Sequence, residues 1–140
     1  YTMKVLLLLL LLFVAISSFK FRAGDEYMES WQTLMSVHQD KCILESNVDP
    51  KKADRIFSHK ELSEDSAFRC YIKCINVHLQ FYNPKEKKFI PEMLLKNIKG
   101  MTQENVQECY SRKNYNEDDC EIVYAAAICA IRHFMKEHSL

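Results

Sequence analysis

Glycine is scarce in this chain, with 2 residues among 140, and proline occurs only 3 times. Phosphate-binding loops and tight hairpins need residues with positive φ, so this scarcity disfavours a nucleotide-binding loop, a doubly wound sheet and a series of hairpins. An excess of one charge is also lacking, because 19 basic side chains balance 19 acidic ones. The chain therefore lacks the excess of basic side chains that is typical of nucleic-acid-binding proteins. With 48% hydrophobic and 27% charged residues, the composition is that of one globular domain.

One long apolar run is present, and it lies at the start of the sequence. Lys4 is followed by apolar residues from Val5 to Ile16, and then by Ser17 and Ser18. A positive start, an apolar core and small residues after it are typical of a secretory signal peptide. A helix of this length reaches about 18 Å, short of the roughly 30 Å of a bilayer core, which disfavours a membrane anchor.

We therefore expect cleavage after Ser17, so that residues 1–17 are a signal peptide and residues 18–140 form a secreted, extracellular domain. Tyr1 and Thr2 precede the methionine and are interpreted as not native, with Met3 as the start. No later apolar run is long enough to span a bilayer, so we expect the mature chain to be soluble.

Six cysteines fall in the expected mature region. They are Cys42, Cys70, Cys74, Cys109, Cys120 and Cys129. An even number in a small exported chain is typical of a disulfide framework, and six cysteines allow fifteen pairings. Zinc sites favour C-x2-C pairs, which are absent here, so we expect neither a metal nor a cofactor. The spacings 70/74 and 120/129 place two cysteines on one face of a helix and two on opposing sides of another, so each helix can be tied to two others.

Apolar side chains recur every three or four residues in several stretches, which predicts an all-α domain of about six helices. The expected helices are residues 25–46, a short helix from Pro50 to about Phe57 capped by Asp49, a third capped by Ser63 and ended by Asn83-Pro84, a fourth from Pro91 to Ile98 closed by Gly100, a fifth capped by Thr102, and a sixth capped by Asn116. The sixth is apolar nearly all round, so it should be the central, buried helix. The lysine-rich segment 84–90 is interpreted as a solvated loop.

The cysteine spacing C-x27-C-x3-C-x34-C-x10-C-x8-C, behind a signal peptide and on an all-helical chain, resembles that of the insect odorant-binding proteins, the pheromone/general-odorant-binding family. The x3 and x8 pairs match the two fixed spacings of that family. The resemblance covers the chain from about Asp25 to His138. It implies three interlocked disulfides around an apolar cavity, and the implied pairs are Cys42–Cys74, Cys70–Cys120 and Cys109–Cys129.

The resemblance also implies a function, that of a secreted carrier for small hydrophobic ligands. Odorants, pheromones or lipid-like molecules would be bound in the cavity and transported through aqueous extracellular fluid. A membrane odorant receptor would be an indirect partner, and we expect a monomer or a weak homodimer. The sequence does not separate an olfactory role from a scavenger or carrier in saliva or reproductive fluid. A helical signalling protein without a cavity is a third alternative.

Enzyme classes are disfavoured because their motifs are missing. The sequence contains no G-x-S-x-G, H-E-x-x-H or EF-hand pattern. A secreted phospholipase A2 would need adjacent cysteines and a glycine-rich calcium loop, and the sequence has neither. Since all six cysteines are expected in disulfides, none is left as a nucleophile. We therefore expect no catalytic residues.

Ligand cavities of this kind are lined by apolar and aromatic side chains with a few polar anchors. The third and sixth expected helices are the most apolar and the most tightly bridged, so they should form the rigid walls. Asn76 and Tyr124 are the polar candidates, because a buried amide or phenol needs a partner. The expected ligand-binding residues are Met35, Phe57, Ile72, Ile75, Asn76, Phe89, Leu94, Val123, Tyr124, Ala127, Ile128, Ile131 and Phe134.

The segment after Cys129 has only 11 residues. We expect it to hold the end of the sixth helix and a short lid, with Phe134 and Leu140 turned toward the cavity. His133 and His138 lie in this lid, and histidine gains a proton as the pH falls below neutral, so acid could loosen it. The alternative is that both are surface residues that favour a helix C-terminus.

Overall fold

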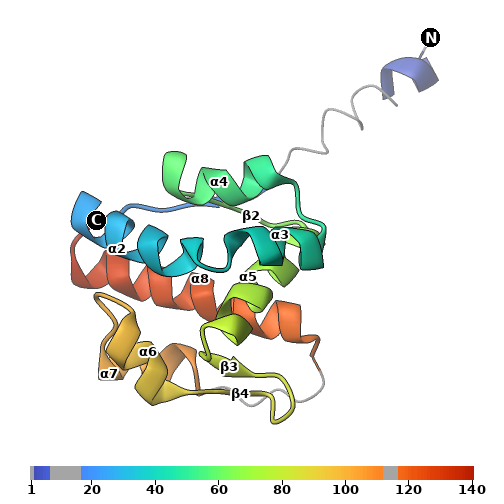
Figure 1. Ribbon diagram of the computed structural model, residues 1–140. Helices are drawn as coiled ribbons and strands as arrows, with labels where there is room; N and C mark the ends of the chain where they lie inside the picture. Colours follow the sequence, from blue (N-terminus) through green and yellow to red (C-terminus); the bar gives the residue numbers. More distant parts are fainter. Residues whose placement is uncertain (1, 7–16, 112–116) are drawn as a thin grey trace.

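A computed structural model of the chain describes residues 2–6, 17–111 and 117–140, and from Ser17 onward these residues form a mainly helical domain (Figure 1). The helices are α2 (Asp25–Ser36), α3 (Gln39–Ser46), α4 (Pro50–Ser58), α5 (Ser66–His78), α6 (Pro91–Asn97), α7 (Gln103–Cys109) and α8 (Asp119–Glu137). Two short antiparallel pairs of strands accompany them, β1 (Ser18–Lys20) with β2 (Glu61–Ser63) and β3 (Tyr82–Asn83) with β4 (Lys88–Phe89). Most of the expected signal peptide lies outside the described residues. The predicted all-α class is confirmed.

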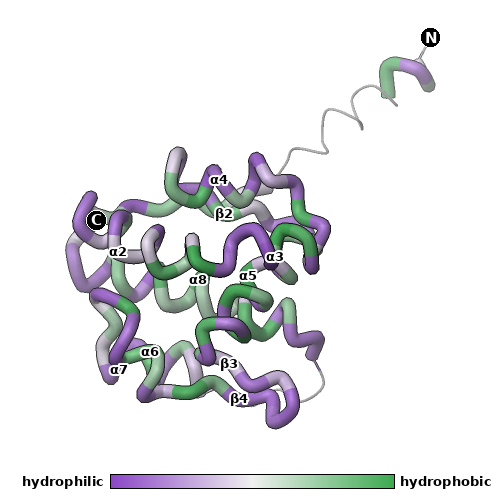
Figure 2. The backbone as a smooth tube through the Cα atoms, in the orientation of Figure 1, coloured by the Kyte–Doolittle hydropathy of each residue, from purple (hydrophilic) through white to green (hydrophobic). Residues whose placement is uncertain are grey.

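Helix α8 is the centre of the domain, as its apolar sequence predicts, and it packs against α5 and α7 (Figure 1). Figure 2 shows hydrophobic residues along α5 and α8 where these helices meet, and hydrophilic residues over the outer turns. Phe68, Tyr71 and Val123 are the large side chains at the heart of this core, each at most 1% exposed. A smaller cluster consists of Leu94 on α6, Val106 on α7 and Phe81 just before β3.

Three disulfides connect the helices in an interlocked pattern. They are Cys42–Cys74 between α3 and α5, Cys70–Cys120 between α5 and α8, and Cys109–Cys129 between α7 and α8. These are the same three pairs that the family resemblance implies. Each closes a loop in the unfolded chain, and in the chain-entropy model the entropy that this removes stabilises the fold by roughly 3–4 kcal/mol. Helices α2, α4 and α6 carry no cysteine, so noncovalent contacts hold them against the framework.

Two helices stand where the sequence predicts one between residues 25 and 46. α2 ends at Ser36 and α3 begins at Gln39, and His38 between them has φ −112° and ψ 4°. The break lets α2 turn Trp31 and Met35 toward an internal cavity while α3 carries Cys42 to α5. From Ser17 onward, the described part of the chain therefore holds seven helices where about six were expected.

Two of the predicted helix caps are present and one is wrong. Asp49 and Thr102 accept hydrogen bonds from backbone N–H groups in the first turns of α4 and α7. Ser63 does not cap α5, because residues 61–63 form β2 paired with β1, and Asp65 caps the helix instead. The predicted cap Asn116 lies outside the described residues, and Asp118 caps α8.

The lysine-rich segment forms the turn of the β3–β4 hairpin. Lys85 and Lys88 are exposed as expected, whereas the ammonium of Lys87 lies 3.6 Å from a carboxylate oxygen of Asp119 at the start of α8. The hydroxyl of Tyr82 donates to the same carboxylate at 2.6 Å. Burial and this hydrogen bond raise the pKa of Tyr82 above its usual value, so its hydroxyl remains a donor at physiological pH. The hairpin is thereby fixed to α8.

We expect Asp65→Ala to lower the free energy of unfolding by about 1–2 kcal/mol near neutral pH, because it removes the cap of α5. Burial alone raises the pKa of Asp65, but hydrogen bonds from Lys52, Ser63 and the Phe68 amide outweigh it and hold the pKa at about 2. This pKa is lower in the folded than in the unfolded state, so the stabilisation is complete above about pH 4 and is lost as the pH falls toward 2. About a third of the side chain is exposed, so solvent screening reduces the electrostatic part.

Urea unfolding of the wild type and Asp65→Ala at pH 6 and at pH 2 measures this effect. The difference in stability between the two proteins should shrink at pH 2. An equal difference at both pH values would contradict the electrostatic account of this cap.

Candidate functional site

An apolar cavity of about 150 Å³ lies inside the domain, bounded by residues of α2, α4, α5, α7 and α8 and of the segment between α6 and α7. Its lining residues are Phe21, Trp31, Leu34, Met35, Ile56, Phe57, Leu62, Ile72, Ile75, Asn76, Leu79, Phe81, Ile98, Lys99, Gly100, Met101, Asn105, Tyr110, Ala127, Ala130, Ile131 and Phe134. The polar side chains of this wall belong to Trp31, Asn76, Lys99, Asn105 and Tyr110. A dry apolar cavity of about this size can hold a molecule as large as benzene.

Eight of the thirteen predicted ligand-binding residues line this cavity. They are Met35, Phe57, Ile72, Ile75, Asn76, Ala127, Ile131 and Phe134. On α8, the cavity-lining positions 127, 130, 131 and 134 follow helical spacing, so one stripe of this helix faces the cavity. Contact of these residues with a ligand stays a prediction.

Five predicted residues do not line the cavity. Val123 is 1% exposed in the main core, and Leu94 is fully buried in the smaller cluster with Phe81 and Val106. Tyr124, Ile128 and Phe89 line a more polar hollow on another face of α8. Apolar spacing does not show which side of α8 faces the cavity, because this helix is apolar nearly all round.

The cavity wall also contains residues that sequence reasoning missed. Phe21 and Leu62 lie in or next to the short strands, where no helical spacing marks them, and Lys99 and Gly100 lie in a loop. For Asn105, in contrast, the sequence did contain an indication that its side chain faces inward. This residue lies four residues before Cys109, so on a helix it shares the face that the bridge to α8 turns inward.

Aromatic rings close the end of the cavity around Phe134, which is 3% exposed. Its ring lies 4.8 Å from that of Tyr27 and 5.1 Å from that of Trp31, both edge-on, and 4.1 Å from the ring of His138, which stacks on it. Gly100, with φ 88°, approaches so closely that a Cβ atom there would stand 3.0 Å from Phe134. A glycine is therefore required for this side of the wall to close.

The only charged side chain among the described residues of the wall is that of Lys99. Its ammonium lies 3.3 Å from a carboxylate oxygen of Glu26 and 5.5 Å from the centre of the Tyr27 ring. Its backbone carbonyl accepts a hydrogen bond of 2.9 Å from the indole N–H of Trp31. The cation of the wall is thus already paired with a carboxylate.

Asn105 is the most deeply buried polar side chain of the wall, at 2% exposure. Its Nδ2 donates to the carbonyl of Ala130 at 3.3 Å, and within the described part of the chain its Oδ1 has no hydrogen-bond partner. A buried acceptor without a donor costs about 1–3 kcal/mol. Nearby, burial raises the pKa of Tyr110 above its usual value, so its phenol is neutral at physiological pH.

The two histidines of the expected lid hold the end of α8 in place. His138 Nδ1 lies 2.8 Å from the Phe134 carbonyl and must donate to it, which leaves Nε2 to accept from the Tyr27 hydroxyl at 3.2 Å in the neutral ring. After protonation Nε2 would donate to the same oxygen. His133 Nε2 lies 2.5 Å from a carboxylate oxygen of Glu108 on α7, a contact that protonation strengthens.

The loosening of this segment by acid stays a prediction, and so does the alternative in which both histidines are surface residues that favour a helix C-terminus. His138 is exposed, whereas His133 is half-buried. The expected turn of Leu140 toward the cavity is wrong, because Leu140 is 48% exposed and does not belong to the cavity wall. Phe134 does turn inward as expected.

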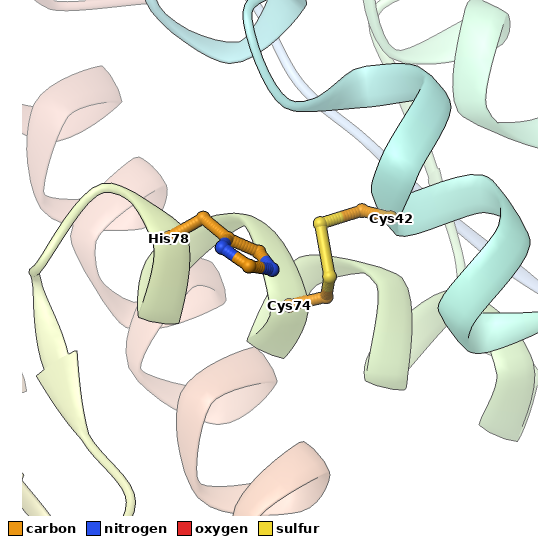
Figure 3. Close-up of side chains that lie close together, drawn as sticks. All are labelled: Cys42, Cys74 and His78. Atoms are coloured by element: carbon orange, nitrogen blue, oxygen red, sulfur yellow. A yellow bond between two sulfur atoms is a disulfide. The ribbon is translucent and has the colours of Figure 1, made fainter.

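A histidine also stands beside one of the disulfides. Figure 3 shows His78, one turn after Cys74 on α5, next to the Cys42–Cys74 bridge. Its Nε2 lies 3.4 Å from a carboxylate oxygen of Glu45, and its ring stacks on that of His38. Zinc is bound by cysteine thiolates, and the two sulfurs here are bonded to each other, so this group does not form a cysteine-ligated metal site.

A helical domain crossed by three interlocked disulfides and hollowed by an apolar cavity defines a carrier of small hydrophobic ligands. The family model of the PBP/GOBP family matches residues 24–133, and the chain belongs to this family. The resemblance seen in the cysteine spacing is therefore confirmed. None of the curated proteins compared with the sequence matches it.

Among solved structures, the chain is similar to the fatty acid binding protein OBP56a from the oral disk of the blowfly Phormia regina. The TM-score is 0.60 and the sequence identity 14%, with 84% of this chain and 98% of the blowfly chain covered. At this identity the likeness shows a shared fold.

None of the described helices is both long enough and apolar enough to cross a membrane.

Proposed function

We propose that residues 18–140 form a secreted carrier, released by removal of residues 1–17, that takes small neutral apolar molecules into its cavity. It would transport odorants, pheromones or lipid-like molecules through aqueous extracellular fluid toward a membrane odorant receptor. The observation that carries the proposal is the cavity wall, which is almost wholly apolar and whose one described cation, Lys99, is paired with Glu26. Moving apolar surface from water into such a wall is favourable by about 25 cal/mol per Å².

The disulfides support the extracellular part of this proposal. All six cysteines are paired, and such bridges persist in oxidising compartments and are rare in the cytosol. A chain that needs three bridges to hold α3, α5, α7 and α8 together is suited to dilute extracellular fluid. We expect it to act there as a monomer or a weak homodimer.

A carrier role outside smell is the second candidate. The blowfly protein with this fold comes from the oral disk and is described as binding fatty acids. A similar role in saliva or another secreted fluid would use the same cavity. The tissue in which the protein is found would separate the two roles.

Trp31 provides a direct test of binding, because it is the single tryptophan of the chain and lines the cavity. Titration of the oxidised protein with medium-chain alcohols, esters and simple aromatics should change its fluorescence in a saturable way. We expect about one site, dissociation constants on the order of micromolar, and loss of binding after reduction of the disulfides.

Trp31→Phe serves as the matched control. It should abolish the fluorescence signal while the same ligands still displace a fluorescent apolar probe from the cavity. No saturable binding by a folded, fully oxidised protein would overturn the proposal and favour a surface-acting helical signalling protein.

A further inference from the structure

Asn105 lines the cavity, and its side-chain oxygen is a buried polar atom without a hydrogen-bond partner among the described residues. Resting on the carrier function proposed above, we propose that this oxygen accepts a hydrogen bond from the bound ligand. The ligand class is then narrower than small apolar molecules in general. It consists of apolar molecules that carry a hydroxyl group, such as medium-chain or aromatic alcohols.

The neighbouring carbonyl fixes which end of the Asn105 amide is free. The oxygen of Ala130 can only accept, so the NH2 group of Asn105 must face it at 3.3 Å and Oδ1 must be the free end. A flipped amide would place two acceptors against each other. The orientation of the amide is therefore determined by chemistry.

The amide and its partner are also held on covalently connected helices. Asn105 lies one turn before Cys109 on α7, and Ala130 follows Cys129 on α8. The disulfide between these two cysteines keeps α7 and α8 together at this point. Asn105 can thus act as a preorganised anchor, which limits the ordering cost of a hydrogen bond to the ligand.

Bulk solvent does not reach this oxygen, because its solvent-accessible area is below 1 Å². A ligand reaches it when nearby side chains of the wall shift. Met35 and Met101 are flexible members of that wall, and methionine adapts its shape at low energetic cost. A ligand bound there can then donate the hydrogen bond that Oδ1 of Asn105 lacks.

The charge pattern of the wall excludes charged donors. Among its described residues there is no carboxylate, so a protonated amine would be buried without a counter-ion. An ionised fatty acid has no donor and would place negative charge against Oδ1. Esters, ethers and aldehydes offer only acceptors. A neutral hydroxyl group fits all of these conditions.

The isomers 1-octanol and 1-methoxyheptane test the inference, because they have the same formula and nearly the same shape, and only the alcohol donates a hydrogen bond. We expect the wild-type protein to bind the alcohol at least about tenfold more tightly in a Trp31 fluorescence titration. Equal affinities, or tighter binding of the ether, would overturn the inference and leave the carrier function intact. Binding of neither isomer, nor of any other apolar ligand, would overturn the carrier function itself.

Variants then locate the anchor. Asn105→Leu should abolish the preference by weakening alcohol binding about tenfold while the ether binds as before. Asn97→Leu is the matched control and should keep the preference, since the Asn97 amide donates to the Met93 carbonyl at 2.9 Å and does not belong to the cavity wall. Asn76→Leu tests the other amide of the wall, and loss of the preference there but not in Asn105→Leu would overturn the assignment. If Asn105→Leu does not fold, the wild-type isomer pair and Asn76→Leu still decide.

Discussion

Replacing both Cys70 and Cys120 by alanine is expected to lower the free energy of unfolding by about 4 kcal/mol and the melting temperature by more than about 10 °C. The bridge joins residues 50 positions apart, so its removal frees the largest loop of the unfolded chain. It also unties α5 from α8, the two helices that form the main core. The Arg69–Glu121 ion pair beside the bridge is partly exposed, so it offsets less than about 1 kcal/mol of the lost free energy of unfolding.

The matched comparison is the double alanine variant of Cys109 and Cys129. These residues are 20 positions apart, so the expected loss is smaller, about 3 kcal/mol. Guanidinium unfolding of both oxidised variants measures the difference. If the variant that lacks the shorter loop is the less stable of the two, loop entropy does not set the order.

Phe134→Ala is expected to cost about 3–5 kcal/mol, because it removes a buried ring and leaves a void among Tyr27, Trp31 and Gly100. Phe89→Ala is the control on the same residue type. Phe89 is only half-buried and does not line the cavity, although it packs on Tyr110 of the wall as well as on Tyr82, so its loss should be smaller. Chemical unfolding of both variants gives the comparison, and equal costs would contradict the role given to Phe134.

The same substitution should change which ligands fit. Removing the ring of Phe134 enlarges the cavity at its aromatic end, so bulkier branched alcohols should gain affinity relative to 1-octanol. Phe89→Ala should leave this ratio unchanged. Phe134→Leu offers a milder form of the change if Phe134→Ala does not fold. Displacement of a fluorescent apolar probe measures the ratio in each variant.

The fold was largely predictable because a few strong sequence signals agree. Cysteine spacing and apolar periodicity both require helices at the right places, and the family resemblance selects one of the fifteen pairings. The break at His38 was not predictable, since neither glycine nor proline marks it and apolar spacing continues through it. It follows from tertiary demands, with α2 facing the cavity and α3 reaching α5 through Cys42.

The cavity was only partly predictable, because apolar spacing reports burial and not the kind of space on the buried side. Ile72 and Val123 have the same apolar, β-branched character, yet Ile72 lines the cavity and Val123 fills the core. Asn105 was missed because an asparagine on a short helix is usually exposed. Its alignment with Cys109 was the one signal that could have revealed it.

The order of the cysteines along the chain has a consequence for synthesis. Because the chain is synthesised from its N-terminus, Cys42 and Cys74 are the first native pair of which both cysteines are present. Cys70 must wait for Cys120, and Cys109 must wait for Cys129, so both remaining bridges depend on α8. The synthesis of α8 therefore closes the covalent framework, and until this helix appears the thiols of Cys70 and Cys109 have no native partner on the growing chain.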